Sequence, residues 1–114
     1  MKACIFKPQW GDECEIRFVK TAYAHDDSLA IAVLSRELDS EFWEPYATLT
    51  VNIGMPLGSN EAYLDDNNVQ DLCEYVIENG WARNVGSGMS GWCTYQKVEF
   101  TDEFLNEICE EVVS

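Results

Sequence analysis

The chain has 114 residues, with 21 Asp and Glu against 7 Lys and Arg, so its formal net charge at neutral pH is −14. Apolar residues make up 46% of it, which is enough for a hydrophobic core, and the length predicts a single domain over residues 1–114. Because an acidic surface repels phosphates and anionic lipid, these counts argue against direct binding to DNA, RNA or a membrane.

The cysteines and the N-terminal residues indicate a compartment. There are five cysteines, an odd number, and no two have C-x-x-C spacing. No signal peptide is visible, since Lys2 is followed by only a short apolar run before Lys7 and Pro8. No apolar stretch is long enough to cross a membrane. We therefore expect free thiols in a reducing cytoplasm.

The first part of the chain predicts strands separated by polar turns. Residues 3–6 predict an edge strand that ends before Pro8, and the alternation in residues 15–24 predicts a second strand. Residues 29–34 are almost entirely apolar, which favours a central strand, although their alanines leave a helix open. Residues 37–41 predict a turn.

The clearest predicted strand covers residues 46–53. Ala47, Leu49, Val51 and Ile53 fall on one face and alternate with Tyr, Thr and Asn on the other, which is the period of two that a half-buried strand requires. β-branched residues are frequent in it, and no Gly or Pro interrupts it. We expect the rest of the chain to cover its apolar face or to extend its sheet.

Two helices are predicted in the second half. Asn68 suits the N-cap of the first, whose apolar side chains recur at spacings of three and four and which ends at Gly80. Thr101 suits the N-cap of the second, over residues 102–112. The predicted buried face of this second helix consists of Phe104, Leu105, Ile108, Cys109 and Val112.

The remaining segments complete the predicted fold. Residues 62–64, 81–85 and 92–100 are expected to be extended, and residues 86–91, with three glycines, are expected to be a flexible loop. Four strands, a helix, two strands and a helix follow one another. This order predicts an α+β fold in which an antiparallel sheet of about five to six strands carries two helices on one face.

No residue pattern indicates a known chemistry. His25 is the only histidine, and beside Asp26 and Asp27 it is typical of a polar turn, whereas zinc would need several Cys or His at recognisable spacing. Cys93 and His25 would form a dyad only if the fold brought them together. We therefore predict no catalytic residue, no metal and no cofactor, and expect a protein that is not an enzyme.

Acidic side chains line the outer face of the predicted second helix. Glu103, Glu107, Glu110 and Glu111 are neighbours there and repel one another. Glu110 and Glu111 also fall in the last turn, where the helix dipole disfavours an anion by about 0.3–1 kcal/mol. Because this cost has no evident structural gain, we interpret the row as a candidate partner-binding surface. The plainer alternative is a solvated helix end.

Three further residues are candidates for partner binding. Asp65 and Asp66 form a second acidic cluster at the start of the first predicted helix. Trp92, beside the glycine loop, is either an apolar anchor for a partner or a core aromatic.

Several segments between residues 45 and 100 have a familiar pattern. They are Pro45-Tyr46-Ala47-Thr48-Leu49-Thr50-Val51-Asn52, Asp66-Asn67-Asn68, Glu78-Asn79-Gly80, Ser90-Gly91-Trp92-Cys93-Thr94-Tyr95 and Phe100. Together they resemble a family of small uncharacterised proteins from phages, plasmids and other mobile elements of Gram-positive gut bacteria, with Gln96 in a place where Pro is expected. The resemblance brings no catalytic residues. It implies an accessory gene on mobile DNA, expressed in a bacterial cytoplasm that contains defence systems.

The charge and this setting together predict an anti-defence inhibitor of the anti-CRISPR kind. Its acidic surface would mimic nucleic-acid phosphates and bind a basic nucleic-acid-binding protein, such as a Cas9-type effector, whose channels are positively charged. Two alternatives stay open. One is a mobile-element accessory module that binds another protein through a sheet edge near Pro8 or Pro45. The other is a small hydrolase that uses Cys93 or cleaves guide RNA.

Overall fold

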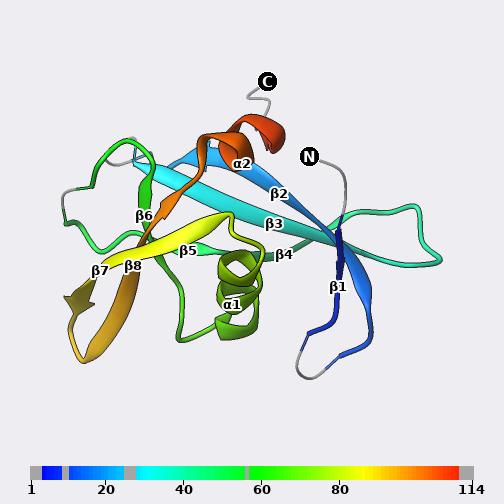
Figure 1. Cartoon of the computed structure of the whole chain (residues 1–114). Helices are drawn as coiled ribbons and strands as arrows, with labels where there is room; N and C mark the ends of the chain where they lie inside the picture. Colours follow the sequence, from blue (N-terminus) through cyan, green and yellow to red (C-terminus); the bar gives the residue numbers. More distant parts are fainter. Residues whose placement is uncertain (1–3, 9–10, 25–27, 56, 111–114) are drawn as a thin grey trace.

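The computed structural model describes residues 4–8, 11–24, 28–55 and 57–110, and these form two β-sheets and two helices (Figure 1). The first sheet contains β1 (Cys4–Phe6), β2 (Cys14–Ala22), β3 (Leu29–Glu37) and β4 (Glu44–Thr48), antiparallel in that order, with β9 (Cys109–Glu110) added parallel to β2. The second sheet has the antiparallel order β5 (Thr50–Val51), β6 (Glu61–Leu64), β8 (Cys93–Phe100) and β7 (Ala82–Ser90). The helices are α1 (Gln70–Glu78) and α2 (Asp102–Glu107).

The predicted α+β class is confirmed, but the prediction of one sheet of five to six strands is wrong. The chain passes from the first sheet to the second inside residues 46–53, the stretch that predicted a single strand. Leu49, fully buried, is the residue at which it bends. The apolar and polar residues alternate in the sequence through the bend, but the faces they occupy change, since in β5 Thr50 is buried and Val51 is only half-buried.

The hydrogen bonds of Leu49 join the two sheets. Its N–H donates to the carbonyl of Ile31 in β3 at 2.8 Å, and its carbonyl accepts from the N–H of Asp65, directly after β6, at 2.9 Å. The backbone of one residue is therefore hydrogen-bonded to both sheets. Thr50, which follows it, was predicted to lie on the polar face, yet it is only 3% exposed.

Thr50 replaces a backbone partner that the bend removes. β4 pairs with β3 from Ala32 to Ser35 and no further, so the N–H of Ile31 has no strand opposite it. The Thr50 Oγ1 atom accepts from that N–H at 3.1 Å and lies 3.0 Å from the Tyr23 hydroxyl. A buried side-chain oxygen thus completes the edge of β3 where the chain leaves the sheet.

The predicted glycine loop over residues 86–91 is wrong. Most of it is strand: β7 runs to Ser90, and only Gly91 and Trp92 form the turn before β8. Gly91 has φ +61°, which suits glycine at the first position of a two-residue hairpin turn. At Gly88 a Cβ atom would lie 2.6 Å from the ring of buried Tyr63, so here glycine allows close packing rather than mobility.

Both helices start near their predicted positions, but only α1 ends where predicted. Gly80, with φ +74°, terminates α1 as expected, while Val69 rather than Asn68 precedes its first turn and makes no side-chain cap. Thr101 caps α2 as predicted, accepting from the N–H of Phe104 at 3.1 Å. α2 then ends at Glu107 instead of continuing to residue 112, because Ile108 is extended and leads into β9, which pairs with β2.

The Asp66 carboxylate ties the turn before α1 to β8. One of its oxygens accepts from the backbone N–H of Gln96 at 3.0 Å, and the other accepts from the Gln96 side-chain amide at 2.8 Å. Asp65 acts more locally and accepts from the amide of Asn68. Buried Cys73 of α1 lies beside these acids, and burial first, then the charge of Asp66, raises the pKa of its thiol.

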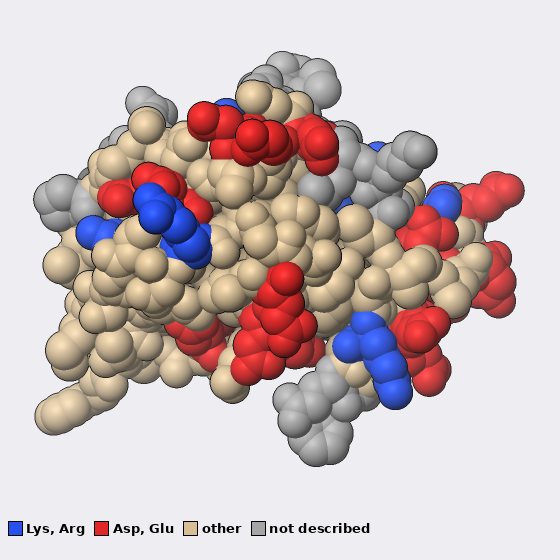
Figure 2. Space-filling model, viewed as in Figure 1, with Lys and Arg blue, Asp and Glu red and all other residues tan. Residues whose placement is uncertain are grey.

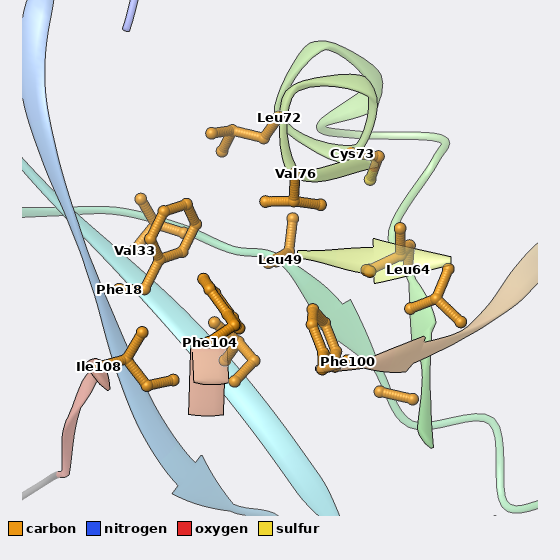
Figure 3. Close-up of a cluster of buried hydrophobic side chains, with 14 of the residues drawn as sticks. Phe18, Val33, Leu49, Leu64, Leu72, Cys73, Val76, Phe100, Phe104 and Ile108 are labelled. Carbon is orange, nitrogen blue, oxygen red and sulfur yellow. The ribbon is translucent and has the colours of Figure 1, made fainter. Parts of the chain in front are cut away.

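Both sheets and both helices contribute to one hydrophobic core (Figure 3). Leu72, Cys73 and Val76 enter it from α1, and Phe104 enters from α2 (Figure 3). The ring of Trp81 links these parts, since its centroid lies 5.4 Å from Phe104 in a stacked arrangement. Trp81 also makes edge contacts with Phe18 of β2 and Tyr75 of α1.

Changing Thr50 to Val is expected to lower the free energy of unfolding by about 1–3 kcal/mol, because it leaves the buried N–H of Ile31 without a partner while keeping the side-chain shape. Denaturant unfolding followed by circular dichroism measures the change. Thr48→Val, at an exposed position two residues earlier, is the matched control and should have little effect. Equal stability of the two variants would contradict the role assigned to Thr50.

Gly88→Ala is expected to destabilise the protein by about 1–3 kcal/mol, since the added methyl group would overlap the ring of Tyr63 and the side chain of Ile53. Gly11→Ala is its control, because the nearest atoms there would lie 3.6 Å away. The thermal midpoints of the two variants check the prediction. If Gly88→Ala has a thermal midpoint as high as that of Gly11→Ala, Gly88 is not required for packing, and the predicted flexible loop over residues 86–91 would be favoured again.

Asp66→Ala is expected to lower the free energy of unfolding by about 1–3 kcal/mol through loss of both bonds to Gln96. The neighbouring exposed residue provides the control, Asn67→Ala. Urea unfolding of both variants, compared with the parent chain, measures the difference. A neutral result at Asp66 would mean that its carboxylate has no structural task and is available to a partner.

Candidate binding surface

The predicted row of four glutamates on the second helix does not form. Glu103 and Glu107 are exposed on α2, but Glu110 lies in β9 and Glu111 lies outside the described residues. The predicted row, with glutamates at i, i+4 spacing, required a helix that continues to residue 112. The pairing of β9 with β2 ends α2 five residues earlier, at Glu107. α2 therefore presents a shorter acidic patch made of Asp102, Glu103 and Glu107.

The other predicted partner-binding residues lie apart from this patch. Asp65 and Asp66 make hydrogen bonds within the protein, as described above. Trp92 is fully exposed in the β7–β8 turn, so the alternative of a core aromatic is wrong. β8, with eight residues, separates Trp92 from α2 by about 26 Å at about 3.3 Å per residue. Its role as an anchor stays a prediction.

A groove between α1 and β1 collects acids that the sequence did not place together. Its volume is about 510 Å³, and it is lined by Phe6, Lys7, Gln70, Asp71, Glu74, Tyr75 and Glu78. The i, i+4 spacing of Glu74 and Glu78 is visible in the sequence, but the contact between α1 and β1 is not. The site therefore depends on the tertiary structure.

Two aromatic rings form the apolar part of this groove. Phe6 and Tyr75 are in edge contact with centroids 5.1 Å apart, and the Tyr75 hydroxyl donates to the carbonyl of Ile5 at 3.3 Å. Burial, reinforced by the charge of Cys4 and a hydrogen bond with it, raises the pKa of Tyr75 to about 12, so the phenol is neutral. Glu74 and Glu78 are exposed beside these rings.

The acidic groups lie in several patches rather than one row. Figure 2 shows red surface over α2, over α1 and at the far end of the β2–β3 pair, with uncharged surface between them. Arg36 pairs with Glu15 and Arg83 pairs with Glu99, both within sheets, whereas Lys7 lines the α1–β1 groove together with three acids of α1, Asp71, Glu74 and Glu78. Three acids against one lysine leave the lining of the α1–β1 groove with a net negative formal charge.

The described residues offer little for catalysis. Within them, no three His, Cys, Asp or Glu side chains gather in a way that could hold a metal ion. Cys14, Cys73 and Cys93 are free thiols, and Cys4 forms a hydrogen bond with Tyr75. His25 lies outside the described residues, so its relation to Cys93 stays a prediction. In the described chain, α1 and α2 are both too short to cross a membrane.

Comparison with known proteins places this fold in a family. Searches of the curated proteins and of the solved structures found no match. The family described as Domain of unknown function (DUF4313) matches residues 19–114. This range contains the second sheet and both helices, and so includes the acids of α1 that line the groove. The predicted membership of an uncharacterised domain family is confirmed: this chain belongs to the DUF4313 family.

Proposed function

We propose that the protein is a non-enzymatic inhibitor that binds a basic, nucleic-acid-binding protein through its acidic surface, with the α1–β1 groove at the centre. The observation that carries this proposal is the groove itself, where exposed Glu74 and Glu78 stand beside an aromatic wall in a chain of net charge −14. The acidic patch on α2 adds to the negative electrostatic potential of the protein, which acts at long range.

The groove has the chemistry to accept a lysine or arginine side chain. Carboxylates at i and i+4 have Cβ atoms about 5–6 Å apart, so both can approach one cation. A guanidinium can also form two parallel bonds with one carboxylate. The rings of Phe6 and Tyr75 can pack against the aliphatic part of such a side chain or against its charged group. Aromatic and charged contacts together distinguish this groove from a merely solvated helix face.

Such binding would compete with nucleic acid. Each basic residue of the partner that is occupied by a carboxylate is unavailable to a phosphate. Opposite charges also steer the two proteins together, which makes association fast and sensitive to salt. The acids of α1 and α2 would then act as phosphate mimics, and no bond of the partner or its nucleic acid would be broken by this protein.

The identity of the target is the finer part of the proposal. The resemblance of the segments between residues 45 and 100 to proteins of phages and mobile elements supports an anti-defence role in the cytoplasm of a bacterial host. A Cas9-type effector has the required positively charged channel. We therefore propose an anti-CRISPR activity. An interference assay with purified protein and a panel of CRISPR effectors identifies the target.

Charge reversal at two patches tests the mechanism on that target. Glu74→Lys with Glu78→Lys is expected to weaken binding at least about tenfold, because it places cations in the groove that receives a cation. Glu103→Lys with Glu107→Lys is the matched control, since each double variant moves the formal net charge from −14 to −10, by two units per substitution. Titration calorimetry at rising salt measures both affinities.

The comparison separates a local site from overall charge. A larger loss for the α1 variant locates the contact in the groove, and affinity for the parent chain should fall as salt rises. Equal losses for both variants would leave only the net charge and contradict the groove. An affinity that responds neither to salt nor to either double variant would overturn the inhibitor mechanism.

A further inference from the structure

Only one face of the first sheet contributes to the hydrophobic core. The core side chains of β2 and β3 are Ile16, Phe18, Ile31 and Val33, and because successive residues of a strand point to opposite faces, their neighbours lie on the other face. Both helices contribute to the same core, so neither α1 nor α2 covers that other face. We define it, the outer face, by six partly exposed residues: Arg17, Val19, Ala32, Leu34, Arg36 and Trp43.

Two arginines of the outer face stack over one aromatic ring. Trp43 directly precedes β4, the strand that pairs with β3. The guanidinium carbon of Arg36 in β3 lies 4.9 Å from the centre of the Trp43 ring, and that of Arg17 in β2 lies 5.1 Å from it. Stacking on an indole holds a guanidinium in position and removes water from one of its faces. Both cations are therefore fixed and partly desolvated.

The charges of these two arginines are balanced differently. Arg36 pairs with Glu15 at 3.1 Å, whereas Arg17 forms no ion pair with any described residue. The Nε atoms of both arginines are buried and have no hydrogen-bond partner in the protein. The outward residues of β2 and β3 thus carry two arginines against one glutamate, a local excess of positive charge in a chain of net charge −14. A partly desolvated cation without a partner favours the approach of an anion.

The composition of the outer face indicates which anion fits it. Tryptophan and arginine are enriched at protein interfaces and among the residues that contribute most to binding. Leu34 lies opposite Arg17, and Val19 lies opposite Ala32, so partly exposed apolar surface adjoins the unpaired guanidinium. Nucleic acid carries many phosphates and is repelled by a chain of net charge −14. A single carboxylate within an apolar protein surface matches both the charge and the surroundings.

We propose that the outer face of the first sheet binds the side-chain carboxylate of an aspartate or glutamate that a partner protein presents within an apolar surface. The terminal nitrogens of Arg17 donate two parallel hydrogen bonds to this carboxylate, and Trp43 keeps the guanidinium in position. Leu34 and Val19 contact the apolar surface around it. This site takes a ligand of opposite charge to that of the α1–β1 groove and does not depend on the proposed function.

Two blocked peptides test the inference on the whole chain: N-acetyl-Leu-Glu-Leu-amide and N-acetyl-Leu-Gln-Leu-amide. NMR titration measures binding through the indole N–H signal of Trp43. The glutamate peptide is expected to shift this signal saturably and to bind at least about tenfold more tightly than the glutamine peptide, because only a carboxylate forms the charge-assisted pair of hydrogen bonds. No saturable shift, or equal affinities for the two peptides, would overturn the proposal.

Two further ligands separate a protein carboxylate from other anions. Sodium acetate and a thymidine oligonucleotide are both expected to bind more weakly than the glutamate peptide, since acetate lacks the apolar groups and the oligonucleotide is repelled by the acidic chain. Equal binding of acetate would show an adventitious ion only. Tighter binding of the oligonucleotide would assign the outer face to nucleic acid. Either result contradicts the proposal.

Substitution of the unpaired arginine locates the contact. Arg17→Gln is expected to bind both peptides equally, because it removes the cation that distinguishes them. Arg83→Gln is the matched control: it also removes one positive charge, from a side chain that is 75% exposed on the second sheet, and should keep the preference for glutamate. A merely structural Arg17 would affect thermal stability but not the ratio of the two affinities. Equal preferences in the two variants would contradict the site, and the comparison of peptides on the parent chain stands even if Arg17→Gln is unstable.

Discussion

The fold depends on the backbone hydrogen bonds of Leu49 and on the hydroxyl of Thr50. There the chain leaves one sheet and enters the other, with the Leu49 N–H bonded to β3 and its carbonyl bonded to the residue after β6. The Thr50 side chain satisfies the Ile31 N–H that the departing strand leaves behind. Since an unpaired buried backbone group costs free energy, a change of sheet in the core requires such a substitute.

Close packing of apolar side chains around Leu49 opposes the electrostatic self-repulsion of this acidic chain. Leu49 lies among side chains from both sheets and from α1, and the rings around Trp81 connect β2, α1 and α2 (Figure 3). Apolar burial is the dominant favourable term in folding, whereas repulsion between surface charges is weakened by water and salt. The chain can therefore place most of its acids on exposed positions and remain compact.

The short C-terminal strand changes where the acidic surface can function. Because β9 pairs with β2, α2 stops at Glu107 and cannot present a long row of carboxylates. α1 instead lies against β1, and its acids border a groove with an aromatic wall. A groove can define the position of a basic side chain more closely than a row of solvated carboxylates. The proposed inhibitor thus acts through α1 first.

Features that depend on near neighbours follow from the amino-acid sequence alone: the α+β class, the Thr101 cap, the end of α1 at Gly80 and the acidity of the surface. Local geometry is enough for these, because caps, glycine turns and helical periodicity involve residues a few positions apart. Long-range contacts instead set the change of sheet at Leu49, the early end of α2, the need for glycine at position 88 and the α1–β1 groove. Each depends on a distant partner (Ile31, β2, Tyr63 and β1), and contacts between residues so far apart leave no periodic pattern in the chain.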